Sequence, residues 1–261
     1  MNVKVINAHW QLLYQMAKRE IKSRYRGSMF GIAWTFLNPL IMLAVYNFVF
    51  SVVFKAKWGG GENTNFAVMM FSGMIIHALF CEVILLSTNS IVGNANYVKK
   101  VIFPLEILTL VITLSALFNF LISFFVLVSM VLLFGGHITL SILWLPIVIM
   151  PLIILSIGIG WVVSALGVFI RDISQFMGVI TSLLLFLSPV FFSITSIPES
   201  FRKFIEYNPL TLIIGEFRKI LITGGSPDLV SLFKYFLCSL VFALLAFIIF
   251  RKLRKGFADV L

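Results

Sequence analysis

Six long runs of apolar residues limit what this chain can fold into. A helix needs about twenty predominantly apolar residues to cross the hydrocarbon core of a membrane. Six stretches meet that requirement, and they cover 32–54, 66–86, 105–134, 140–170, 176–192 and 232–250. The sequence therefore predicts an all-α integral membrane protein with six transmembrane helices.

The overall composition excludes an ordinary soluble fold. Hydrophobic residues make up 61% of the 261 residues and charged residues only 11%, whereas charged residues are about a quarter of a typical soluble domain. We divide the chain into an interface segment at 1–31 and a six-span membrane domain at 32–261. Because the first apolar run starts at residue 32 and is long enough to span, no cleavable signal peptide is expected.

The distribution of basic residues predicts the orientation of the spans. Lys and Arg concentrate in the cytoplasmic loops of membrane proteins. They are dense in the N-terminal segment, in the connections at 87–104 and 171–175, and at the C-terminus. Both termini are therefore expected in the cytoplasm, which agrees with an even number of spans. The formal charge of +10 belongs to a membrane-facing surface, so no nucleic-acid partner is expected.

The segment before the first apolar run has the pattern of an amphipathic helix that lies on the membrane surface. At helical spacing its apolar positions share one face, namely Trp10, Leu13, Tyr14, Ala17 and Ile21. Its polar positions share the other face, namely Gln11, Gln15, Lys18, Lys22 and Arg26. Each basic residue near anionic headgroups contributes about 1 kcal/mol. The pattern fits a simple membrane anchor as well as a more specific role.

The connection at 193–231 predicts two short amphipathic helices on the outer side. The first apolar stripe consists of Ile197, Phe201, Phe204 and Ile205. The second consists of Leu212, Ile213, Phe217, Ile220 and Leu221, and Asn208-Pro209 separates the two. Each stripe is too short to span. The helices either re-enter the outer leaflet and pack on protein, or rest on the outer interface.

Motifs for catalysis and for metal binding are absent from the sequence. There is no G-x-x-x-x-G-K-[ST] segment, so ATP must be bound by a partner. There is no G-x-S-x-G elbow, and the three histidines have no ligand spacing. Cys81 and Cys238 both lie in apolar runs, where small apolar packing is the simplest interpretation. We expect neither an enzyme nor a metal protein.

Glu82 is the clearest charged residue inside a predicted span. A charge at that depth costs about 2.5–3.5 kcal/mol on insertion scales. Because no Lys or Arg within the spans would pair with it, we favour a hydrogen-bonded structural role over a proton or substrate site. An ion-coupled secondary transporter that uses Glu82 remains the alternative. A membrane enzyme acting on a lipid-linked sugar would depend on Glu82, Glu106 or Asp172.

Two connections on the predicted cytoplasmic side carry further candidates. Arg171 and Asp172 follow the fourth apolar run directly, and they predict either a local ion pair in a tight turn or a contact with a partner or lipid head. The connection at 90–104 mixes apolar and basic residues. That mixture is typical of a short helix seated in the groove of another protein, and an interfacial hinge gives the same pattern.

Five short segments follow one another along the chain in a characteristic order. They run from 24 to 39 (Arg24-Tyr25-Arg26-Gly27-Ser28, Gly31, Trp34, Asn38-Pro39), from 99 to 104 (Lys-Lys-Val-Ile-Phe-Pro), from 171 to 175 (Arg-Asp-Ile-Ser-Gln), from 188 to 190 (Ser-Pro-Val) and from 208 to 210 (Asn-Pro-Leu). In this order they resemble the type-2 ABC exporter permeases for polysaccharides. The O-antigen branch is the most similar, with teichoic acid and capsule exporters as close alternatives. The resemblance covers nearly the whole chain.

This resemblance implies a homodimer in the bacterial inner membrane, associated with two copies of a separate ABC ATPase that binds ATP and Mg²⁺. It implies a substrate glycan carried on undecaprenyl diphosphate. It further implies that the 10–26 helix lies at the interface and contacts the ATPase, that 90–104 contains a coupling helix, and that 193–231 contains an outer gate.

The resemblance also suggests roles for individual residues. Arg24 and Arg26 would contact the diphosphate, because a guanidinium pairs bidentately with phosphate oxygens. The coupling residues would be Asn94, Asn96, Tyr97, Lys99 and Lys100. The outer gate would include Ser188, Pro189, Ile197, Pro198, Phe201, Asn208 and Pro209. We further hypothesise that Ser188-Pro189 weakens the helix of the fifth span and lets the gate bend.

Overall fold

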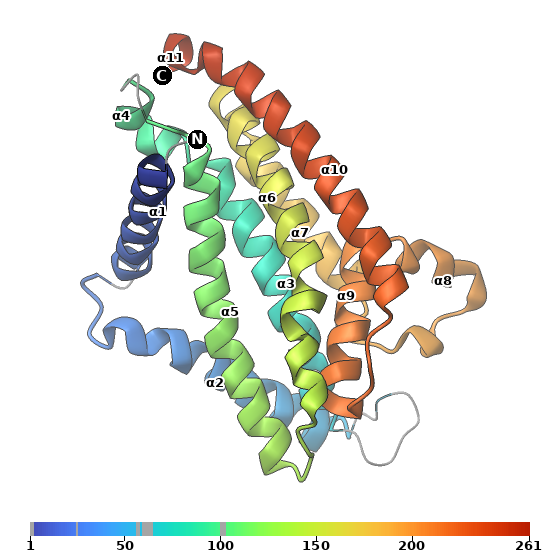
Figure 1. The fold of residues 1–261 in the computed structure, drawn as a ribbon. Coiled ribbons are helices and arrows are strands. Elements are labelled where there is room, and N and C mark those ends of the chain that lie inside the picture. The colour runs from blue at the N-terminus through green and yellow to red at the C-terminus, as the bar shows by residue number, and fades with distance from the viewer. Residues whose placement is uncertain (1–2, 25, 56–57, 59–64, 100–102) are drawn as a thin grey trace.

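The computed structural model describes residues 3–24, 26–55, 58, 65–99 and 103–261, and every regular element in these ranges is a helix (Figure 1). The α-helices are α1 (Val3–Arg24), α2 (Trp34–Tyr46), α3 (Phe66–Thr88), α4 (Ala95–Val98), α5 (Ile107–Leu133), α6 (Leu145–Phe169), α7 (Ile173–Leu187), α8 (Glu199–Glu206), α9 (Pro209–Arg218), α10 (Leu229–Leu253) and α11 (Phe257–Val260). Two π-helical segments, Asn47–Val53 and Lys219–Thr223, extend α2 and α9.

Five helices of the described residues are long and apolar enough to cross a membrane. They are Gly31–Val53, Phe66–Thr88, Ile107–Leu133, Leu140–Phe169 and Leu229–Val260. These five agree with five of the six predicted spans. The remaining predicted span, 176–192, is the fifth in chain order and corresponds to α7. This helix has 15 residues and a length of about 22 Å, short of a hydrocarbon core of about 30 Å.

The amino-acid sequence explains where several helices begin. The Asn65 side chain accepts a hydrogen bond from the Ala67 N–H at 2.9 Å and caps α3. Asn208 caps α9 in the same way, with Pro209 in the first turn. Asp228 caps α10 by accepting from the N–H groups of Val230 and Ser231. Such caps satisfy N–H groups that lack a partner inside the helix.

Helix α6 lies between α3 and α10, and small residues let it approach both. A Cβ atom at Gly158 would lie 2.9 Å from Phe242 Cδ1 of α10, and one at Gly167 only 2.0 Å from the Thr88 carbonyl oxygen of α3. Close approach of backbones through small residues is how membrane helices gain packing energy when lipid removes the hydrophobic driving force. α6 therefore joins α10 to α3, and α3 is the most buried of the five long apolar helices.

Buried apolar side chains form two clusters along the bundle. The larger cluster contains Phe80, Leu127, Leu152 and Phe217. The smaller cluster lies where both chain ends, α4 and α11 come together (Figure 1). We call this part, with the 89–106 connection and the chain ends, the basic end of the bundle, and the part around 134–141 the opposite end.

Helix α1 packs on the smaller cluster with a face that only partly coincides with the predicted apolar face. Met16 and Ala17 are buried there, whereas Trp10 and Tyr14 are 64% and 60% exposed. Met16 was not among the predicted apolar positions. The helix thus has one face on the protein and large aromatic side chains left for another surface.

The two predicted short helices at 193–231 exist, and they differ in burial. In α9 and its extension, Ile213, Phe217, Ile220 and Leu221 are buried against the bundle. In α8, Phe201 is 62% exposed and Phe204 is 68% exposed. α9 therefore packs on protein, while α8 keeps its apolar stripe outside the core.

Candidate functional site

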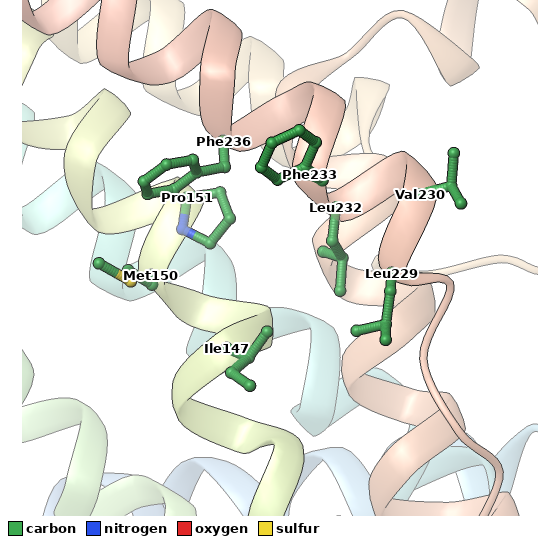
Figure 2. Close-up of a pocket in the computed structure, with 8 residues that line it drawn as sticks. All are labelled: Ile147, Met150, Pro151, Leu229, Val230, Leu232, Phe233 and Phe236. Carbon is green, nitrogen blue, oxygen red and sulfur yellow. The ribbon is translucent and has the colours of Figure 1, made fainter.

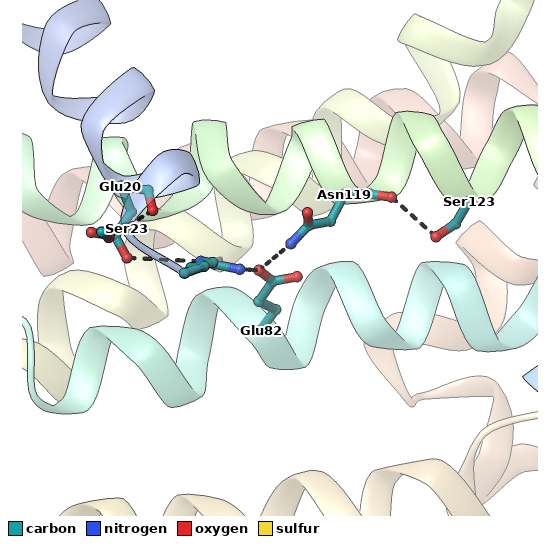
Figure 3. Close-up of polar contacts among 6 residues, drawn as sticks. Glu20, Ser23, Glu82, Asn119 and Ser123 are labelled. Carbon is teal, nitrogen blue, oxygen red and sulfur yellow. Dashed lines mark hydrogen bonds and ion pairs between the residues drawn. The ribbon is translucent and has the colours of Figure 1, made fainter. Parts of the chain in front are cut away.

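The Arg24 side chain, at the end of α1, reaches into the spans and forms an ion pair with Glu82 of α3. The Asn119 amide of α5 donates to the same Glu82 oxygen at 2.8 Å. Figure 3 shows Glu82 between α3 and α5, with Ser23 and Glu20 on α1 nearby and Ser123 one turn beyond Asn119. Three helices thus meet at one carboxylate.

This geometry bears on two expectations about Glu82. Glu82 is hydrogen-bonded, as predicted, and among the described ion pairs no Lys or Arg of a span pairs with it, as expected, but Arg24 of α1 does. The partner comes from the amphipathic helix and not from a span, so a search confined to the apolar runs misses it. The pairing also separates the two predicted diphosphate residues, because Arg24 is engaged with Glu82 whereas Arg26 is exposed.

The predicted coupling residues form a short, mixed surface. A 3-10 turn (Val92–Asn94) leads into α4, which is a single turn. The Asn94 amide donates to the Ser90 carbonyl at 2.9 Å, and the Tyr97 ring stacks on Phe103 with ring centroids 4.4 Å apart. These two side chains are directed toward their own protein.

The remaining coupling residues have a different environment. Asn96 and Lys99 are exposed, while Lys100 lies outside the described residues. The Arg19 side chain of α1 donates to the Tyr97 hydroxyl at 3.1 Å. α1 and α4 thereby present one continuous surface at the basic end.

A second ion pair at the basic end was not predicted. Arg254 donates to both carboxylate oxygens of Glu106 at 2.9 and 3.0 Å, and to the Phe103 carbonyl at 2.9 Å. The Trp161 indole N–H donates to the Glu106 carbonyl at 3.1 Å. α5, α6 and the end of α10 therefore meet at Glu106. The sequence signal that could have indicated this pair is an acidic residue, Glu106, and a basic residue, Arg254, at the ends of two different spans on the same predicted side of the membrane.

Arg171 and Asp172 lie in the turn between α6 and α7, and both are exposed. Among the described ion pairs, none joins these two side chains. The Asp172 carbonyl accepts from the Phe176 N–H at 3.0 Å, so the backbone of this residue begins α7. The turn leaves both charges available at the surface.

Four of the predicted gate residues lie together at the end of α7. The Asn208 amide donates to the Leu187 carbonyl at 3.1 Å and to the Ser188 hydroxyl at 3.0 Å, and Pro189 and Pro209 are the adjacent residues. Ile197, Pro198 and Phe201 belong to the α8 segment and make none of these contacts. The predicted gate thus divides into a hydrogen-bonded bend and an exposed helix.

The hypothesis that Pro189 weakens a helix of the fifth span is wrong. α7 ends at Leu187, and Ser188 has an extended backbone with ψ 153°. The residue before a proline is disfavoured in the α conformation. Pro189 therefore follows the end of the helix and does not kink its interior.

Arg218, at the end of α9, is a functional candidate that the sequence analysis missed. Its guanidinium donates to the Pro189 carbonyl at 2.6 Å and to the Met69 carbonyl at 2.8 Å, and it lies over the Trp58 ring at 4.4 Å. In the sequence it counts only as one basic residue of the outer connection. Nothing in the spacing of the chain indicates that it connects α3, α9 and the bend after α7.

One face of α7 carries polar and small residues at membrane depth. It borders a shallow hollow of about 420 Å³ lined by Ser174, Gln175, Gly178, Val179, Ser182, Leu183 and Phe186. Gln175 and Ser182 are exposed. An exposed polar stripe is unfavourable against lipid tails, so this face fits contact with water or with another protein.

A larger groove, of about 550 Å³, lies between α6 and α10 and differs in character. Figure 2 shows its lining, which is entirely apolar: Ile147, Met150, Pro151, Leu229, Val230, Leu232, Phe233 and Phe236. It offers no polar side chain to orient a sugar or a phosphate. The groove is therefore suited to contact with apolar groups such as lipid acyl chains.

This bundle of apolar helices, with a polar stripe on one short helix and a basic end, defines a membrane permease. The chain belongs to the ABC-2 type transporter family, whose family model matches residues 11–222. The predicted resemblance to type-2 ABC exporter permeases is confirmed.

Three relatives illustrate the similarity. The chain is 27% identical over 254 residues to the O-antigen export system permease protein RfbA of Klebsiella pneumoniae. The aligned region covers 97% of this chain and 95% of that relative. The chain is 27% identical over 250 residues to the protein of the same name from Myxococcus xanthus, covering 95% and 94%. It is 24% identical over 224 residues to the polysialic acid transport protein KpsM of Escherichia coli, covering 82% of each chain.

Proposed function

We propose that this chain is the permease subunit of an ABC exporter that moves a polysaccharide linked to undecaprenyl diphosphate across the bacterial inner membrane. The observation that carries the proposal is the similarity to O-antigen export permeases over 97% of the chain. The polysialic acid relative covers less of the chain, 82%. That difference favours the O-antigen branch over the capsule branch, with teichoic acid export as a further candidate.

A separate ATPase supplies the energy in this proposal. The sequence has no P-loop, so ATP and Mg²⁺ bind to the partner, in two copies. We assign the basic end to the cytoplasm, because Lys and Arg gather there. The exposed Asn96 and Lys99, with the adjoining surface of α1, then meet the ATPase.

The proposed transporter is a homodimer with its passage along α7. The polar stripe at Ser174, Gln175 and Ser182 needs water or protein beside it. The helix Gly31–Val53 also leaves its apolar window unburied within one protomer. A second copy would cover such surfaces, and a glycan between the copies would meet polar side chains of α7. In this arrangement α7 and the bend after it form the fifth span in chain order and bring the total to six.

The charged head of the lipid-linked substrate enters at the basic end in this proposal. Arg26 is exposed and would contact the diphosphate directly. Arg24 would join it only by exchanging Glu82 for a phosphate oxygen. The α8 segment, with its exposed Phe201, forms the moving part of the outer gate.

Two experiments test the proposal. The tagged chain is purified in mild detergent, and an ATPase subunit is expected in equal amount. The gene is then expressed, with its ATPase, in three strains that lack their own O-antigen, teichoic acid or capsule permease, and surface glycan is measured. Restoration of O-antigen alone supports the proposal, whereas a chain that purifies alone and transports without an ATPase contradicts it.

The ion-coupled alternative requires Glu82 to bind the transported proton or cation. A proton or cation site requires a carboxylate that can exchange its ligand during transport. Glu82 instead accepts from both Arg24 and Asn119. This engagement supports the ATP-driven proposal.

A further inference from the structure

We propose that Arg218 is a positioning residue that fixes the outer end of α7 to the start of α3. It thereby sets the shape of the passage wall away from the basic end. The inference rests on the proposed function only where it assigns α7 to the passage. The attachment itself is a property of the fold.

The contacts of Arg218 join three separate segments. Its Nη1 donates to the Pro189 carbonyl at 2.6 Å, and its Nη2 donates to the Val190 carbonyl at 3.2 Å. Nη2 and Nε also donate to the Met69 carbonyl at 2.8 and 3.1 Å, and Nε donates to the Ser72 hydroxyl at 3.1 Å. Every nitrogen of the guanidinium therefore has an acceptor.

The acceptors are backbone carbonyls and one hydroxyl, and no carboxylate of the described residues lies within ion-pair distance of Arg218. Burying a charge is unfavourable unless polar groups surround it, and here carbonyl dipoles supply that environment. Only a planar guanidinium, with five donors in a fixed fork, reaches acceptors on two segments at once. A lysine ammonium lacks this geometry.

The neighbouring residues leave room for this side chain. A Cβ atom at Gly73 would lie 2.8 Å from Arg218 Nη2 and 3.1 Å from the Val190 Cα. Glycine at this position of α3 therefore allows both the guanidinium and the bend to approach. The Trp58 ring, 4.4 Å from Arg218 Cζ, covers the group from another side by a cation–π contact.

The bend after α7 needs such donors. The last carbonyls of a helix have no partner within the helix, and Pro189 brings no N–H of its own. Asn208, at the start of α9, donates to the Leu187 carbonyl. Arg218, at the end of α9, donates to the Pro189 and Val190 carbonyls further along the bend. The bend is therefore contacted by residues at both the N-terminal and the C-terminal end of α9.

A contact nearer the middle of α7 complements the one at its end. His77 Nε2 of α3 lies 3.0 Å from the Thr181 carbonyl of α7. α7 is therefore attached to α3 at two levels, by His77 within the span and by Arg218 at the bend. Loss of Arg218 is expected to release the outer end and leave the inner end in place.

The test measures the exposure of the bend directly. A cysteine is introduced at Ser193, just beyond the bend, in a background that keeps the buried Cys81 and has the exposed Cys238 replaced by Ser. The rate of its reaction with a membrane-impermeant thiol reagent is measured without ATP. The rate follows the local opening of this segment.

R218M is expected to raise the labelling rate of S193C about tenfold or more, because several charge-assisted hydrogen bonds are lost. R218K keeps the charge without the fork and is expected to raise the rate almost as much. A cysteine at Ser174, near the other end of α7, is expected to label at an unchanged rate. K219M, at the exposed neighbouring residue, is the matched control and is expected to behave as the parent.

If R218M does not fold, G73A answers the same question, since it displaces the guanidinium and keeps its charge. An unchanged S193C rate in the folded R218M or G73A protein overturns the inference. An equal rise at Ser174 also overturns it, because it indicates general unfolding. Labelling requires no export, so a failure of glycan export in the parent protein contradicts the proposed function alone.

Discussion

Arg24 and Glu82 form an ion pair although 58 positions separate them in the sequence. The first residue ends the amphipathic helix α1, and the second lies within the span α3. Asn119 of α5 completes the contact. α1 is therefore joined to two spans by a charged contact as well as by apolar packing.

Glu82→Gln is expected to destabilise the protein by about 1–3 kcal/mol, because it leaves the Arg24 charge with only the Glu20 carboxylate, 3.8 Å away, as an acidic partner. The double variant R24Q/E82Q is expected to recover most of that loss. Thermal unfolding in detergent measures both effects. If E82Q abolishes transport while stability is unchanged, and the double variant rescues nothing, Glu82 has a direct transport role.

Arg254→Gln is expected to loosen the 103–106 connection, because it removes the contacts to Glu106 and the Phe103 carbonyl. We expect a loss of about 1–3 kcal/mol, the range for a partner left unsatisfied, and reduced stimulation of the ATPase by the permease. Lys255→Gln, at the exposed neighbouring residue, is the control. Equal behaviour of the two variants would argue against a role for this ion pair.

Gly167→Ala is expected to destabilise the bundle by about 1–3 kcal/mol through overpacking. The added Cβ would lie 2.0 Å from the Thr88 carbonyl. Gly215→Ala, in α9, has no heavy atom within 4 Å of its new Cβ and is expected to gain about 0.5–1 kcal/mol from helix propensity. Opposite shifts in melting temperature support the packing of α6 on α3, and a stable G167A excludes it.

Pro189→Ala is expected to leave transport close to the parent level, because α7 already ends at Leu187 and Asn208 and Arg218 hold the bend. Asn208→Ala is expected to be more harmful, since it removes the α9 cap, which is worth about 1 kcal/mol, and the contact to Leu187. Surface glycan and unfolding temperature are measured for both. A severe export defect in P189A with normal stability would restore a hinge role for that proline.

Ser182→Cys is expected to react with a charged thiol reagent, because the proposed passage brings water to this face of α7. Leu244→Cys lies on the apolar span α10, away from the proposed passage, where the native side chain is 56% exposed, and it is expected to resist the reagent. Both variants are made with Cys238 replaced by Ser. Equal protection of the two cysteines would place the polar stripe of α7 away from water.

Hydrophobic run length predicts most of the helices, because crossing a membrane imposes a minimum length. The run at 66–86 agrees closely with α3, and the run at 105–134 agrees closely with α5. The run at 176–192 is shifted relative to α7, since hydropathy does not register the backbone restriction at Ser188-Pro189. The break at Asn208-Pro209 was predicted because its signal, an Asn cap before a proline, is local.

The contacts that organise the candidate site were beyond prediction from a single sequence. Arg24 with Glu82, Arg254 with Glu106, and Arg218 with the Pro189 carbonyl each join distant segments. Amphipathic periodicity gave α1 its correct secondary structure and included the buried Ala17 in the apolar face, yet it did not identify Met16 as a buried residue. Which face packs on protein depends on where the neighbouring spans lie, and this information is not present in the helix itself.

The smaller apolar cluster joins segments that lie far apart in the sequence. It combines Met16 and Ala17 of α1 with Phe250 and Phe257, and both phenylalanines are fully buried. The cluster is complete only when α10 and α11 lie beside α1 and α5. The position of the amphipathic helix is therefore tied to residues from the other end of the described chain, and a substitution at Phe250 or Phe257 is expected to weaken the packing around α1 as well.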